Sequence, residues 1–197
     1  KFAQQQWPEA QAMLAQLKAK NTLSPEDQLI EAYLLIHQKQ ENEARQRFES
    51  ILENNPKNVD AIMGLALQLL RKGFLEDSLS WLNRGLEINP RQSKAHYLRA
   101  SILFRQGDYL QGDLAIARAL ELDPANPSFQ LLFLRRQLMQ GELAVVEKQL
   151  KRIQEKHPLN TEALLLQADL YKNRGNTDES EKLLRQAILV QDSPSIH

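Results

Sequence analysis

The segment LELDP, at residues 120–124, repeats the pattern of LEINP, at residues 86–90, after an interval of 34 residues. The prolines that end these segments belong to a series with the same spacing: Pro56, Pro90, Pro124 and Pro158. Four glycines follow the same period: Gly73, Gly107, Gly141 and Gly175. A fixed period between about 20 and 50 residues is typical of proteins built from stacked structural repeats. The sequence therefore predicts a repeat architecture.

Each interval contains two helical patterns. In the clearest interval, the first pattern follows Ser93 and ends at Gly107, because glycine just past a helix end adopts the left-handed conformation at little cost. The second pattern begins near Tyr109 and ends before Pro124, since the residue before a proline is biased away from helix. Helix starts are predicted at N-cap residues and at prolines in the first helical position: Ser24, Asn58, Asn126 and Asn160, with Pro25 and Pro127.

Composition and charge exclude several classes of protein. The 25 basic and 25 acidic residues leave no net charge, which argues against a polyanion as the main partner. The absence of cysteine excludes disulfides, thiolate metal sites and cysteine nucleophiles. No apolar run reaches the roughly 18 residues that a membrane-spanning helix needs.

Side chains that could carry chemistry lack the required arrangement. None of the four histidines has a second histidine or another spaced zinc ligand four residues later, and His96 occupies a helical position that we interpret as structural. Acidic pairs such as Glu76-Asp77 open helices, where carboxylates favour the positive end of the helix dipole. The basic pairs Arg135-Arg136 and Lys151-Arg152 alternate with acids, which is typical of a solvated outer face. We expect no catalytic residue, no metal and no cofactor.

Residues at equivalent positions of the intervals resemble the tetratricopeptide repeat (TPR) family. That family has a small residue in its first helix (helix A), a large residue between small ones in its second helix (helix B), and a late proline. The small helix-A position holds Ala32, Ala66, Ala100, Leu134 and Ala168. The large helix-B position holds Phe48, Leu82, Ile116, Leu150 and Leu184. The resemblance implies an all-α fold, a right-handed α-α superhelix of stacked helix-turn-helix repeats.

The resemblance also implies a division of the chain into repeats. The periodic prolines place five units at residues 25–58, 59–92, 93–126, 127–160 and 161–194. Residues 1–24 match the second half of a preceding unit plus a connector, and residues 195–197 form a tail. Because the chain starts at Lys1 without Met or a signal peptide, we interpret it as a processed or excised part of a longer protein.

Two features depart from an ideal stack. Lys39 stands where the other four units have glycine, so either that turn differs or Lys39 is strained by roughly 1 kcal/mol. Terminal repeats need a polar outer face, yet apolar side chains at both chain ends lack an evident neighbour. These are Leu14 and Leu17 near the N-terminus and Leu184, Ile188 and Val190 near the C-terminus. We expect either further helices or self-association through the chain ends.

In the TPR family, helix A lines a concave surface where partners dock. Transferred position by position, the lining in this chain is mostly apolar, so we expect an extended peptide or an amphipathic helix with apolar anchors. The open alternative is that these residues contact the opposite wall or neighbouring helices. The predicted lining is Leu29, Tyr33, Ile36, Met63, Leu67, Leu70, Lys94, Tyr97, Ser101, Phe104, Leu131, Arg135, Leu138, Leu165 and Asp169.

The expected function is a non-enzymatic scaffold that binds a protein or peptide segment, with no nucleic acid as partner. The repeats resemble those of bacterial envelope assembly factors, such as components of cytochrome c maturation or polysaccharide export. This resemblance implies the periplasm or envelope, with the cytoplasm as the other location. The alternative function is a regulatory or substrate-recruiting TPR module of a larger enzyme.

Overall fold

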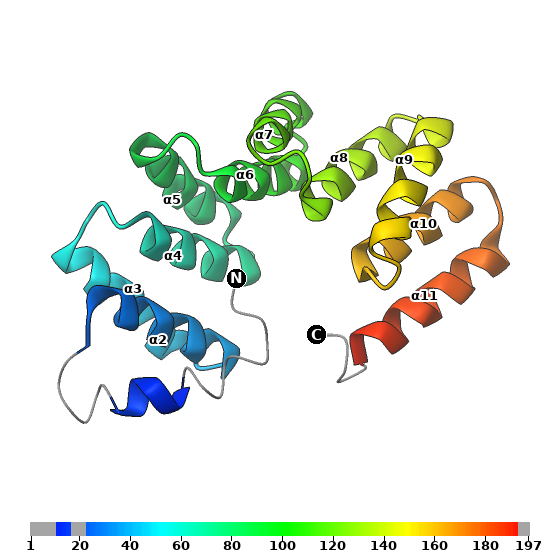
Figure 1. Cartoon of the computed structure of the whole chain (residues 1–197). Helices are drawn as coiled ribbons and strands as arrows, with labels where there is room; N and C mark the ends of the chain where they lie inside the picture. Colours follow the sequence, from blue (N-terminus) through cyan, green and yellow to red (C-terminus); the bar gives the residue numbers. More distant parts are fainter. Residues whose placement is uncertain (1–10, 17–22, 193–197) are drawn as a thin grey trace. The chain divides into compact units, whose positions relative to one another are not determined.

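The computed structural model describes residues 11–16 and 23–192, and every regular element within these ranges is an α-helix (Figure 1). The chain divides into two compact units, an N-terminal unit of residues 1–108 and a C-terminal unit of residues 109–197.

The N-terminal unit is a series of antiparallel helix pairs. Helix α2 packs against α3, and α4 packs against α5. The pairs are joined because α3 also packs against α4, and α5 against α6. The helices are α2 (Pro25–His37), α3 (Glu41–Asn54), α4 (Val59–Arg71), α5 (Leu75–Ile88) and α6 (Ser93–Gln106).

The C-terminal unit repeats this arrangement. Helices α8 and α9 form one pair and α10 and α11 another, while α7 packs against α8 and α9 packs against α10. The helices are α7 (Tyr109–Leu122), α8 (Pro127–Met139), α9 (Leu143–Lys156), α10 (Thr161–Asn173) and α11 (Thr177–Asp192).

The predicted N-caps are confirmed. The Ser24 hydroxyl accepts a hydrogen bond from the Asp27 amide at 3.2 Å, and the Asp27 carboxylate accepts one from the Ser24 amide at 2.9 Å. Asn58 and Asn160 each accept from the backbone amide three residues later at 2.9 Å. Asn126 accepts from the Ser128 amide at 3.2 Å. These contacts satisfy amide donors that a helix start leaves without an intrahelical partner.

Small residues on helix A let helix B approach closely, as the family pattern predicts. Ala32, Ala66, Ala100 and Ala168 are fully buried, and Leu134 is buried despite its size. The large helix-B side chains are buried as well at Phe48, Leu82, Ile116 and Leu150. Phe48, Leu82 and Leu150 belong to core clusters that join one helix pair to the next.

The C-terminal helix departs from this pattern. Leu184 and Ile188 are 40% and 57% exposed, so the prediction that they lack a covering helix is confirmed. For Val190 that prediction is wrong, because its side chain packs with Leu164 and Ala187 and is buried. Leu14 is buried, and Leu17 lies outside the described residues.

The turn between α2 and α3 contains a strained lysine. Lys39 has a φ of 62°, while the glycines at the corresponding positions have φ between 79° and 85°. The prediction that Lys39 is strained is therefore confirmed. The turn has the same conformation as in the other units, and Lys39 adopts the left-handed conformation that L side chains disfavour.

We predict that Lys39→Gly raises the free energy of unfolding by about 0.5–1 kcal/mol, since relief of left-handed strain exceeds the added flexibility of the unfolded chain. Urea denaturation measures the change. The matched control is Gly73→Ala, which introduces the same strain at a φ of 84° and is expected to lower stability. A lower stability of Lys39→Gly would contradict the assignment of strain.

Candidate functional site

Most of the apolar groove positions of the N-terminal unit are half buried. Leu29, Tyr33 and Ile36 on α2 pack against the core cluster that contains Phe48 and Ile62. Leu67, Leu70 and Tyr97 pack against the next core cluster along the chain, and Phe104 and Ser101 on α6 are also half buried. These residues thus contact neighbouring helices with part of each side chain and keep another part exposed.

Three predicted groove residues have no such exposed part. Met63 is 4% exposed and packs with Leu82 and Leu98 in the N-terminal unit. Leu131 and Leu138 are 4% and 6% exposed and belong to the core between α8, α9 and α10. Because a partner cannot reach these side chains without opening the core, we do not retain them in the groove.

The remaining predicted positions differ in polarity. Lys94 on α6 is exposed, and so are Arg135 on α8 and Asp169 on α10. Leu165 on α10 is half buried against the cluster of Leu164 and its neighbours on α11. The structure therefore brings the apolar groove residues together mainly on α2, α4 and α6 of the N-terminal unit.

Tyr33 connects the first two helix pairs at this surface. Its hydroxyl donates a hydrogen bond to the backbone carbonyl of Asp60 at 3.2 Å. Its ring meets the Phe48 ring edge to face, with centroids 5.4 Å apart and an interplanar angle of 74°. Burial of the hydroxyl, with a smaller contribution from the negative charge of Asp60, raises the Tyr33 pKa to about 12. The phenol is therefore held neutral and in a fixed orientation.

Histidines and acidic residues do not assemble a metal site in the part of the chain that the structure describes, where no group of three His, Cys, Asp or Glu side chains could hold an ion. The His96 ring Nε2 lies 2.9 Å from the carbonyl oxygen of Pro90, which accounts for the placement of this ring. Within residues 11–16 and 23–192, no helix combines the length and apolar character needed to cross a membrane.

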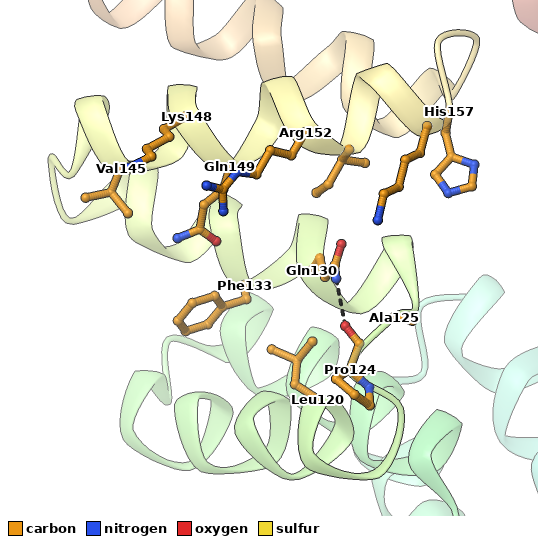
Figure 2. Close-up of a pocket in the computed structure, with 12 residues that line it drawn as sticks. Leu120, Pro124, Ala125, Gln130, Phe133, Val145, Lys148, Gln149, Arg152 and His157 are labelled. Atoms are coloured by element: carbon orange, nitrogen blue, oxygen red, sulfur yellow. Dashed lines mark hydrogen bonds between the residues drawn. The ribbon is translucent and has the colours of Figure 1, made fainter.

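A cavity of about 670 Å³ lies in the C-terminal unit between α7, α8 and α9. In Figure 2, Lys148, Gln149 and Arg152 of α9 lie along one side, and Phe133 and Gln130 of α8 lie on the other. Gln130 Nε2 donates to the carbonyl oxygen of Pro124 at 2.7 Å. Leu120 and Ile153 contribute further apolar surface, and Lys156 contributes another cation.

The sequence pattern did not predict this cavity. It predicted that Lys151-Arg152 lies on a solvated outer face. Arg152 is exposed, and its side chain also lines the cavity. The available signal was the spacing of Lys148, Arg152 and Lys156, since residues four apart lie on the same side of a helix.

We predict that alkaline pH destabilises the protein in part through Tyr33. The pKa of Tyr33 in the folded protein, about 12, exceeds its ordinary value of 10.0. The neutral phenol therefore makes its full contribution to the free energy of unfolding below pH 10, and this contribution is lost as the pH rises toward 12. By pH 11 the loss amounts to about 1 kcal/mol. Urea denaturation at neutral pH and near pH 11 measures this loss in free energy of unfolding. The Tyr33→Phe variant serves as the comparison, because the other groups that titrate in this range are present in both proteins. Equal losses in both proteins would contradict the assignment.

Two family models described as tetratricopeptide repeat match the chain, one over residues 35–102 and the other over residues 93–126 and 161–193, together more than half of its length. "Interferon-induced protein with tetratricopeptide repeats 3" from Mus musculus is 29% identical over 130 residues, which are 64% of this chain and 32% of that protein. The chain therefore spans about a third of the length of this relative.

Solved structures share the fold. PilW, described as a widely conserved type IV pilus biogenesis factor, has a TM-score of 0.72 at 18% identity, covering 98% of this chain and 90% of its own. YrrB, described as a TPR protein with an unusual peptide-binding site, has a TM-score of 0.60 at 16% identity, covering 93% and 94%. At these identities the likeness concerns the fold alone. With both family models in agreement, the chain belongs to the tetratricopeptide repeat family.

Proposed function

We propose that this chain is a non-enzymatic binding scaffold that holds a peptide or protein segment against the A helices of its N-terminal unit. The observation that carries the proposal is the set of apolar side chains that stay half exposed on α2, α4 and α6. An ordinary core residue of this chain, such as Ile62 or Ala66, has no exposed surface at all. The proposed groove residues are Leu29, Tyr33, Ile36, Leu67, Leu70, Lys94, Tyr97, Ser101 and Phe104.

The side chains of the groove are preorganised in the free protein. Leu67 and Tyr97 are held on one side by the core cluster of the second and third helix pairs, so their rotamers are already restricted. The Tyr33 ring is fixed by its contacts with Phe48 and Asp60. Binding then costs little ordering of the scaffold, and the main entropic cost falls on the peptide. Such a surface suits apolar anchors on an extended segment or on one face of a helix.

The biological setting we propose is an assembly process of the bacterial envelope. Support comes from PilW, which has the same fold and is described as a pilus biogenesis factor. YrrB, with the same fold and a described peptide-binding site, supports a peptide as the ligand. In the C-terminal unit, Arg135, Leu165 and Asp169 are the remaining candidates for partner contacts.

The proposal predicts that the double variant Leu67→Ser/Tyr97→Ser loses affinity for peptides selected on the wild-type chain. Two half-buried apolar anchors contribute on the order of 1–3 kcal/mol together, so we expect a loss of about tenfold or more. Fluorescence anisotropy measures the dissociation constant, and circular dichroism verifies the helical content.

The matched control is Phe74→Ser, which removes a 54% exposed aromatic side chain at the turn before α5. This control should retain affinity within about twofold, because Phe74 lies outside the groove. Equal losses in the control and the double variant, or unchanged affinity in the double variant, would contradict the proposed groove.

A further inference from the structure

Three cations on α9 form no ion pair with the acidic residues that the structure describes. Lys148, Arg152 and Lys156 all line the cavity between α7, α8 and α9, and no Asp or Glu is among its lining residues. No carboxylate of the described residues forms an ion pair with any of the three, within 4.0 Å. Some other cations of this unit are paired, such as Arg118 with Glu121, Arg136 with Asp113, and Arg174 with Glu147, and those without an ion pair among the described residues, Arg135, Lys151 and Lys172, do not line the cavity.

The fold does not require this arrangement. If the three cations supported the helix stack, basic residues would recur at the same positions of other repeats. One repeat earlier the positions hold Leu114, Arg118 and Leu122, and two repeats earlier they hold Ser80, Arg84 and Ile88. One repeat later they hold Lys182, Gln186 and Val190. Three cations thus occur together at these positions only in the repeat that contains the cavity.

The opposite wall of the cavity is mostly apolar, with Gln130 as its polar residue. Phe133 on α8 is half buried, and Leu120 on α7 lies on the same side of the cavity (Figure 2). The volume of about 670 Å³ falls within the range of about 300–1,000 Å³ that is typical of ligand sites. A ligand in this space meets positive charge on the α9 side and an aromatic ring on the α8 side.

The spacing of the cations indicates the form of the ligand. Residues four apart on a helix are separated by about 6 Å along its axis. Alternate residues of an extended peptide are separated by about 6.6 Å and point to the same side, while the residues between them point to the opposite side. An extended peptide with alternating acidic residues therefore places its carboxylates along Lys148, Arg152 and Lys156 and an intervening apolar side chain toward Phe133.

We infer that this cavity binds an extended acidic peptide segment that carries an apolar side chain between its acidic residues. A long polyanion fits less well, because the chain has no net charge and Arg118, Arg136 and Arg174 of this unit already have acidic partners. The site is separate from the proposed groove, since Phe133 lies about 200° around α8 from Arg135 and from Leu131.

The experiment uses a panel of fluorescent nonapeptides with glutamate at three alternate positions and Phe, Leu or Ile between two of them. Fluorescence anisotropy measures their affinity for the whole chain. We expect at least one peptide to bind and its version with glutamine in place of glutamate not to bind. The double variant Arg152→Gln/Lys156→Gln should weaken binding about tenfold, because two exposed charge pairs contribute on the order of 1 kcal/mol in total or slightly more.

The matched control is Lys151→Gln, which removes the same charge from an exposed position of α9 outside the cavity. It should change affinity by less than about twofold. The groove variant Leu67→Ser/Tyr97→Ser should leave this affinity unchanged. The experiment therefore tests peptide binding in the cavity independently of the function proposed for the groove. Circular dichroism verifies that every variant is folded.

Four results would each overturn the inference. The first is that no peptide of the panel binds, and the second is that the glutamine versions bind equally well. The third is that Lys151→Gln weakens binding as much as the cavity variant, which would indicate general charge attraction. The fourth is that inorganic phosphate or a single-stranded oligonucleotide displaces the peptide at a lower concentration than unlabelled peptide does.

Discussion

A large buried side chain on a B helix joins its own helix pair to the next one at Phe48, Leu82 and Leu150, and the stack depends on this contact. Phe48 on α3 packs with Ala32 of its own A helix and with Ala61 and Ile62 of the following one. The fit is tight, since a methyl group added at Gly64 on α4 would overlap the Phe48 ring. In the C-terminal unit, Leu150 is surrounded in the same way by Leu134 and Leu166.

This constraint also determines which surface is left for binding. The side of an A helix that faces its neighbours must be small or buried, and the flanking apolar positions are only half covered. Leu29, Leu67 and Tyr97 therefore have a rigid base and an exposed part, which is the combination that a binding surface for a flexible segment needs. In the C-terminal unit the cavity offers a different chemistry, because α9 contributes three cations at positions where no other repeat has three together.

Local signals in the sequence predicted the helix boundaries well. The Asn58 and Asn160 caps depend on one turn of chain, so spacing alone identified them, whereas at Lys39 spacing left two explanations open and the φ of 62° decided between them. Burial of a given side chain depends on the size of residues in neighbouring helices, which spacing does not report. Leu131 was assigned to the groove by family position, yet it lies in a core that also accommodates the large Leu134. The cavity required three helices at once, and only the positions of Lys148, Arg152 and Lys156 hinted at it.

The most direct test of the Phe48 contact is the free energy of unfolding of Gly64→Ala, measured by urea denaturation with and without Phe48→Leu. Helix propensity alone predicts that alanine inside α4 stabilises by about 1 kcal/mol. Our account predicts the opposite sign, a loss of about 1–3 kcal/mol from overpacking against the buried ring. It also predicts that the loss shrinks when Phe48 is already leucine, since the two residues are in contact. A stabilised Gly64→Ala protein, with no coupling to position 48, would contradict it.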